Sequence, residues 1–150
     1  MSSAVDVPLR RILIADDNHD AADTLGALLE ILLPCKVDLA YDGRQAVELA
    51  QSHRPDVAIF DIAMPRMSGI EAAAQLRRDY PGNTPLLVAV TALDDAWTRE
   101  ATQAVGFDRR FTKPVDPVAL LGALAESGAI PAVETATASD IPARVRWVSA

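Results

Sequence analysis

The sequence of 150 residues contains a single cysteine, Cys35. One cysteine allows no internal disulfide and no zinc site built from cysteines, so we expect a structural role for it. Aromatic residues make up only 5% of the chain, so aliphatic residues and alanine must fill the core. No apolar run approaches the roughly 20 residues of a membrane-spanning helix, and the first residues lack the apolar segment of a signal peptide. We therefore expect a cytoplasmic protein that does not enter a membrane.

Positive charge is also scarce. The chain has 14 Lys and Arg residues against 21 Asp and Glu residues, which gives a net charge of −7. This balance argues against a large basic surface for nucleic acid and favours metal cations or basic partners. Half of the residues are hydrophobic, and the length suffices for one domain with its own core.

Short apolar runs alternate with segments of helical periodicity. The runs predict strands over 12–15, 36–41, 57–60, 86–90 and 109–112. The intervening patterns and their Pro and Gly stop signals predict helices over about 20–33, 46–53, 70–80, 94–105 and 116–126. Consecutive parallel strands joined by helices cross over with one hand, which places helices on both faces of the sheet. The sequence therefore predicts an α/β fold with a doubly wound, five-stranded parallel sheet.

Polar side chains stand where four of these strands end: Asp16-Asp17, Asp61, Thr91 and Lys113. In open α/β sheets, ligands bind outside the carboxyl ends of the strands. Each residue alone has a plainer interpretation, since one of the first two aspartates could cap the next helix and Asp61 could be a turn or cap residue. Their convergence on one edge of the sheet instead indicates a site.

Three carboxylates at one point need a cation. Mg²⁺ prefers hard oxygen ligands and commonly combines one or two carboxylates with a phosphate. A lysine and a hydroxyl supply the charge and the donor that a phosphoryl group needs. Phosphoryl transfer depends mainly on positioning and charge neutralisation, so the set predicts a magnesium-assisted phosphoryl acceptor with Asp61 as the nucleophile.

The combined pattern of Asp16-Asp17, Asp61-x-x-x-Pro-x-x-x-Gly, Thr91-Ala92 and Lys113-Pro114 resembles the receiver domain of two-component response regulators. The resemblance covers residues 10 to 126 and implies the flavodoxin-like (βα)5 fold with strand order 2-1-3-4-5. It implies a signalling phosphoprotein rather than an enzyme, one that assists only its own phosphorylation and dephosphorylation. The phosphoryl donor would be a sensor histidine kinase or a histidine phosphotransfer protein, in a two-component system or phosphorelay.

The resemblance also implies a magnesium site. Asp17 and Asp61 would bind Mg²⁺ directly, together with the backbone carbonyl of Ala63, while Asp16 would act largely through water. Ala63 stands two residues after the acceptor and Leu93 two residues after the threonine, where the family contacts the attacking water. Neither side chain can orient water, so we expect slow self-dephosphorylation.

Phosphoryl binding is implied for Thr91, the backbone amide of Ala92 and Lys113, and the peptide bond from Lys113 to Pro114 is a candidate for the cis form. Many receivers carry an aromatic switch residue three positions before the lysine, where this chain has Arg110. The coupled switch of Thr91 and an aromatic residue is therefore altered, and we hypothesise that Arg110 moves towards acidic groups instead.

Two other families offer alternative interpretations of this pattern. A haloacid-dehalogenase-like aspartyl phosphatase needs a second aspartate two residues after the nucleophile, where this chain has Ala63. A flavodoxin cradles phosphate with a loop rich in Ser and Thr, whereas the first loop here is Asp16-Asp17-Asn18 and would repel phosphate.

The ends of the chain differ in composition from the receiver-like region. We expect an N-terminal extension over residues 1–9, a receiver domain over 10–127, and a tail rich in Ala, Thr, Ser and Pro over 128–150. This tail is too short for an ordinary DNA-binding module, so we expect output through a downstream protein. Segment 143–149 alternates and carries Trp147; it is either disordered or a docking strand that could form a dimer.

Several single residues have plain interpretations. His19 is expected to face solvent at the start of a helix, and His53 to suit the dipole at a helix end. Phe107 and Phe111 are expected to be packing residues. Trp97 continues an apolar stripe and favours half-buried packing, with a partner-binding anchor as the alternative.

Overall fold

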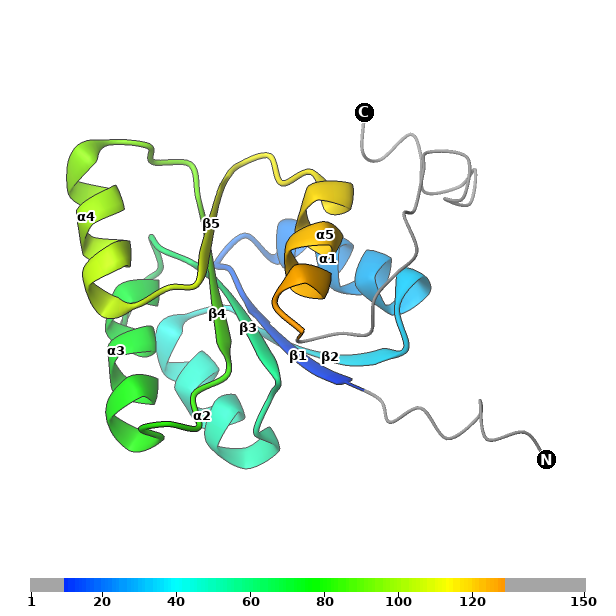
Figure 1. The fold of residues 1–150 in the computed structure, drawn as a ribbon, viewed down its shortest axis with the longest axis horizontal. Helices are drawn as coiled ribbons and strands as arrows, with labels where there is room; N and C mark the ends of the chain where they lie inside the picture. Colours follow the sequence, from blue (N-terminus) through cyan, green and yellow to red (C-terminus); the bar gives the residue numbers. More distant parts are fainter. Residues whose placement is uncertain (1–9, 129–150) are drawn as a thin grey trace.

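The computed structural model describes residues 10–128, in which five strands alternate with five helices (Figure 1). The elements are β1 (Arg10–Ala15), α1 (His19–Leu32), β2 (Cys35–Ala40), α2 (Gly43–His53), β3 (Val57–Asp61), α3 (Gly69–Asp79), β4 (Leu86–Thr91), α4 (Ala96–Val105), β5 (Arg109–Thr112) and α5 (Pro117–Glu126). Among these helices, none is long and apolar enough to cross a membrane.

All strand pairs are parallel, and the sheet has the order β2-β1-β3-β4-β5. Strand β1 lies between β2 and the central strand β3, and pairs Ile12 with Val37 of β2 and with Val57 of β3. The edge strands β2 and β5 are less buried than the inner strands, because residues 36–39 of β2 and all of β5 are partly or fully exposed. The predicted fold class, a doubly wound flavodoxin-like sheet of order 2-1-3-4-5, is confirmed.

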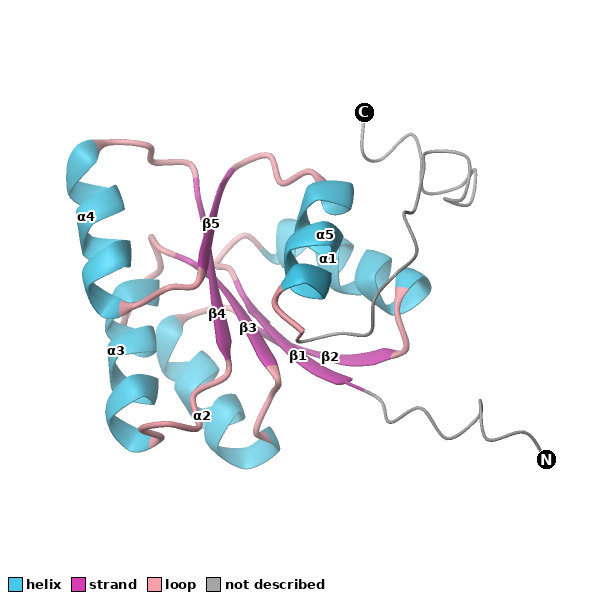
Figure 2. Ribbon diagram, in the orientation of Figure 1, coloured by secondary structure: helices cyan, strands magenta, loops and turns pink. Residues whose placement is uncertain are grey.

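Helices cover both faces of the sheet (Figure 2): α1 and α5 lie on one side, and α2, α3 and α4 on the other. Successive strand residues serve opposite faces. Ile12 and Ile14 pack with Leu29 of α1 and Leu124 of α5, whereas Leu13 packs with the helices on the other face. This two-sided burial explains why the inner strands are continuous apolar runs.

Helix starts are set by side-chain caps. Asn18 caps α1, since its Oδ1 accepts from the backbone N–H of Ala21 at 3.1 Å. The alternative in which Asp16 or Asp17 caps this helix is therefore wrong. Asp95 and Asp116 are the N-caps of α4 and α5, so these helices begin later than the periodicity predicted.

The predictions for the individual ring-bearing residues are confirmed in part. Phe107 and Phe111 are partly buried against the two apolar clusters, as expected. Trp97, in contrast, is 71% exposed, so its predicted half-buried packing is wrong. His19 is exposed as predicted and stacks on Tyr41, with ring centroids 3.8 Å apart.

The predicted extension 1–9 and the tail beyond Gly128, including the docking segment 143–149, lie outside the described residues. Both remain predictions.

Candidate functional site

Strand β3 delivers Asp61 to the carboxyl edge of the sheet. The strand is buried along its whole length, and Asp61 itself is only 7% exposed. The chain then turns back so closely that a Cβ at Gly69 would collide with the backbone carbonyl of Asp61. The Gly69 N–H donates to the carbonyl of Ile62 at 3.0 Å, which closes this turn. The spacing from Asp61 to Gly69 is therefore a structural requirement of the loop.

Strand β1 delivers the acidic pair beside it. Asp16 is buried and its Oδ1 accepts from the N–H of Asn18 at 3.0 Å, while Asp17 is exposed. One carboxylate oxygen from each of Asp16, Asp17 and Asp61 lies within 4.8 Å of the others. The predicted acidic cluster is thus assembled in space.

Lys113, at the end of β5, bridges two of these carboxylates. Its Nζ donates to Oδ2 of Asp16 at 2.8 Å and to Oδ2 of Asp61 at 3.3 Å. The Lys113 backbone N–H donates to the carbonyl of Thr91 at 2.9 Å, which ties the ends of β4 and β5 together. The Lys113–Pro114 peptide bond is cis, as considered from the sequence.

Thr91, the last residue of β4, completes this set of side chains at the strand ends. It is 1% exposed, and its Oγ1 accepts from the N–H of Leu93 at 2.9 Å. Ala92 directly follows β4 and Ala63 is the second residue after β3, and both are exposed at the same edge. All seven predicted positions at the strand ends therefore gather at this edge of the sheet.

The electrostatics of the site leave an excess of negative charge. Burial, and then the charge of Asp16, raise the pKa of Asp61 to about 6 against the opposing effect of Lys113. Burial works against the charge of Lys113, yet its contacts with Asp16 and Asp61 still raise its pKa. One ammonium faces three carboxylates, so oxygen ligands remain for a hard divalent cation such as Mg²⁺.

A cavity of about 660 Å³ opens beside the carboxylates. It lies between α1 and the segment that links β5 to α5, and Asp16, Asp61 and Lys113 are part of its wall. Away from the strand ends its wall includes the apolar Leu25 and Val115 beside the polar Asp20 and Thr24. Because Asp61 is part of this wall, a small group in the cavity would lie beside its carboxylate.

The side chain of Arg110 pairs with Asp94, in the loop between β4 and α4. Its Nη1 donates to Oδ1 of Asp94 at 3.1 Å, and Arg99 donates to the same oxygen at 2.9 Å. These two contacts, the one from Arg99 first, lower the pKa of Asp94. Sequence reasoning did not single out Asp94, because nothing in the local pattern links it to a residue 16 positions away.

The family model of the response regulator receiver domain matches residues 12–125. The chain belongs to this family of receiver domains. It is 34% identical over 110 residues to an uncharacterised 14.6 kDa protein of Leptolyngbya boryana, covering 73% of this chain and 83% of that protein. It is 38% identical over 104 residues to response regulator MprA of Mycolicibacterium vanbaalenii, covering 69% of this chain but only 44% of that protein.

Solved structures give the same result. The CheY-like receiver domain protein of Methanospirillum hungatei superposes with a TM-score of 0.74 at 28% identity, covering 80% of this chain and 94% of that one. The chemotaxis protein CheY4 of Vibrio cholerae, crystallised at low pH, gives a TM-score of 0.73 at 28% identity, covering 79% and 98%.

Proposed function

We propose that Asp61 accepts a phosphoryl group and that the chain is a phosphorylated signalling protein of a two-component system or phosphorelay. The observation that carries this proposal is the bridge from Lys113 to Asp16 and Asp61, which assembles residues 97 positions apart around the acceptor. Within the proposal, Asp16, Asp17, Asp61 and the carbonyl of Ala63 hold Mg²⁺, which would neutralise charge on the transferred group.

The chemistry is a displacement at phosphorus. A carboxylate oxygen of Asp61 forms the new O–P bond, and the P–N bond of a donor phosphohistidine breaks. The electron pair of that bond stays on the imidazole nitrogen, which takes up a proton. Lys113, Thr91 and the amide of Ala92 then bind the phosphoryl oxygens, as ammonium, hydroxyl and N–H groups do in other phosphoryl sites.

Labelling with a small donor tests the proposal. Acetyl phosphate with Mg²⁺ should add one phosphoryl group to the intact protein, detected by mass spectrometry. Asp61→Asn should abolish the labelling, while Asp79→Asn, which removes an exposed carboxylate on α3, should leave it unchanged. Labelling of Asp61→Asn to the wild-type level would contradict the assignment.

The lifetime of the phosphoryl group is a second part of the proposal. Ala63 and Leu93 both face solvent near the acceptor, and neither carries a group that could orient water. We expect slow loss of phosphate, and a faster loss when Leu93 is replaced by Asn, whose amide can bind water. Following the decay of the labelled protein after removal of the donor measures both rates, and rapid loss from the wild type would refute this part.

For the switch, Arg110 and Thr91 are proposed to respond together. Asp94 stands three residues after Thr91 and already pairs with Arg110, so movement of this loop on phosphorylation would disturb that contact. Comparing the protein with and without beryllofluoride by NMR should show a change at Arg110. Arg109, which pairs with Glu126 at 3.4 Å, serves as the control. An unchanged Arg110 would contradict its role.

The donor and target of this site follow from the family as proposals. We propose a sensor histidine kinase or histidine phosphotransfer protein as donor and a downstream protein as target, all in the cytoplasm. The net charge of −7 supports a protein target over nucleic acid. A dimer through the tail is proposed as well. Sedimentation should then give a dimer for the full chain and a monomer for a chain that ends at Gly128, and equal masses per chain in the two would contradict the proposal.

A further inference from the structure

The loop between β3 and α3, residues 62–68, carries Ala63 but has few backbone bonds at its tip. Its base is closed by Gly69 and by the N–H of Ile62, which donates to the carbonyl of Val90 at 3.3 Å. Near the tip, the backbone contact is local, from Met67 N–H to the Pro65 carbonyl at 2.7 Å. The tip therefore depends on side chains for its position.

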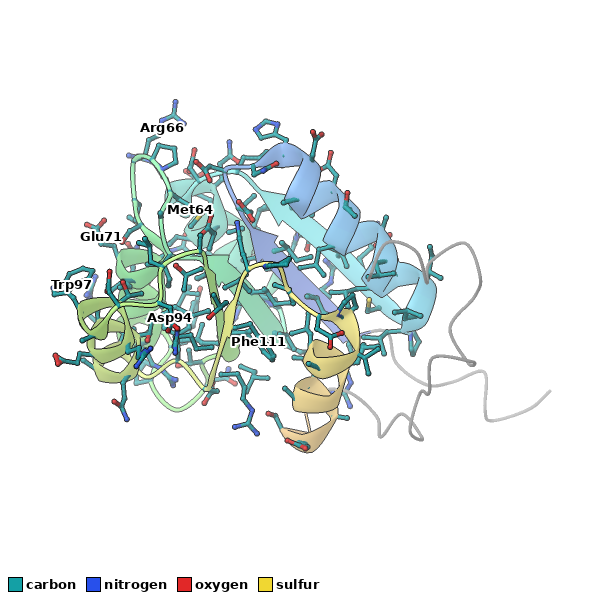
Figure 3. All side chains as sticks on the ribbon, turned by 90° about the horizontal axis from the view of Figure 1, so that it is seen from above. Met64, Arg66, Glu71, Asp94, Trp97 and Phe111 are labelled. Carbon is teal, nitrogen blue, oxygen red and sulfur yellow. The ribbon has the colours of Figure 1, made fainter. Side chains whose placement is uncertain are left out.

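Arg66 supplies such a contact. Figure 3 shows Arg66 at the tip of this loop, at the margin of the molecule. Its Nη1 donates to Oδ2 of Asp42 at 2.8 Å, across to the loop between β2 and α2. Arg66 has a φ of 66°, in the left-handed region that side chains other than glycine seldom adopt. Such a conformation persists where surrounding contacts hold it.

The side chain of Asp42 is held in place by burial and by a hydrogen bond of its own. Its side chain is only 4% exposed, and its Oδ1 caps α2 by accepting from the N–H of Gln45 at 2.8 Å. Next to it, a Cβ at Gly43 would collide with the backbone carbonyl of Met67. The start of α2 thus lies directly against the β3–α3 loop, and the ion pair joins two segments already in contact.

We infer that the pair of Arg66 and Asp42 positions the β3–α3 loop so that the carbonyl of Ala63 is preset for the divalent cation. Arg66 is here a positioning residue, acting through the backbone three residues away. The inference rests on the proposed function, since it assigns Ala63 to the cation site. A loop already held in place loses less conformational freedom when its carbonyl is bound, so the cation binds more tightly.

The test measures Mg²⁺ binding to the full chain by calorimetry, without any phosphoryl donor. Arg66→Ala should weaken binding by about tenfold, the lower end of the range for loss of an outer-shell partner, because Arg66 acts through the backbone. It should also broaden or shift the backbone amide signals of residues 63–67 before Mg²⁺ is added. Arg44→Ala is the matched control, because it removes an equal charge from α2 at a residue that pairs with Glu48, at 3.9 Å.

Asp42→Asn distinguishes loss of the ion pair with Arg66 from loss of the N-cap of α2. Asparagine still accepts from Gln45 but loses the charge, so it should match Arg66→Ala, and the double variant should be no weaker than either. Arg66→Lys should restore part of the affinity. Equal Mg²⁺ affinity for Arg66→Ala and Arg44→Ala would overturn the inference. Failure of acetyl phosphate to label the wild type, with Mg²⁺ still bound, would instead refute the proposed function.

Discussion

Helices α3 and α4 cover neighbouring parts of the same sheet face but are attached to it differently. Helix α3 buries Ala72, Ala73 and Leu76, and Leu76 is fully inaccessible to solvent. It begins with a capping box, in which the side chains of Ser68 and Glu71 each accept from the other's backbone N–H. Apolar burial and a defined start both hold α3 in place.

Helix α4 has neither a buried aliphatic side chain nor a capping box. Its two buried side chains are Thr98 and Thr102, and the Thr102 hydroxyl donates to carbonyls of its own helix. Its largest apolar residue, Trp97, points away from the core, as Figure 3 shows. At its end, Gly106 adopts a φ of 96°, whereas α3 ends at Tyr80 with a φ of −131°.

This difference in attachment matches the proposed roles of the two site residues that precede these helices. Helix α3 follows Asp61, the proposed phosphoryl acceptor, and α4 follows Thr91 in the region proposed to respond to phosphorylation. Stability in a folded protein is distributed unevenly, and elements with little apolar burial open at lower cost. We therefore expect α4 to be the less stable of the two helices.

Truncating Leu76 should produce the largest effect. Leu76→Ala leaves a cavity in the core between α3 and the sheet, so unfolding in urea should show a loss of about 2–5 kcal/mol. Trp97→Ala removes a larger side chain from α4 but should change the free energy of unfolding by less than about 0.5 kcal/mol. Similar losses in the two variants would mean that both helices are held equally.

Most of the fold could be predicted because its signals are local. A strand buried on both faces is a short apolar run, and Val57–Asp61 and Leu86–Thr91 show this plainly. The strand ends then determine which residues meet, since parallel strands place their carboxyl ends together. Asp16, Asp61 and Lys113 could be assigned to one site for this reason before any distance was known.

The remaining features depend on contacts across the sequence. Arg110 pairs with Asp94 and Arg66 with Asp42, across 16 and 24 positions of the sequence. Charge alone does not select one partner among 21 acidic residues. The exposure of Trp97 was mispredicted because threonines, which carry little weight in an apolar periodicity, occupy the inner face of α4.

A change of intermediate size in the free energy of unfolding is expected for a substitution at the end of α4. Gly106→Ala places a side chain at a left-handed φ, which should cost about 1–2 kcal/mol, and its Cβ would approach the guanidinium of Arg77 to 3.3 Å. Gly122→Ala in α5 is the control: a Cβ there meets nothing within 4 Å, so stability should rise by about 0.5–1 kcal/mol. Urea unfolding measures both, and a gain in Gly106→Ala would show that α4 does not depend on its glycine cap.

The smallest effect concerns the loop that begins α4, and it depends on pH. Hydrogen bonds from Arg99 and then from Arg110 lower the pKa of Asp94, so its ionised form is stabilised by folding. This contribution is present above the ordinary pKa of aspartate and is lost as pH falls through the lowered pKa of the folded state. Wild type should therefore be slightly more stable than Asp94→Asn at pH 7, and the two should converge in acid. Because these groups are exposed, concentrated salt should also reduce the difference at pH 7. A difference that persists unchanged in acid would show that Asp94 stabilises the loop by packing and not by its charge.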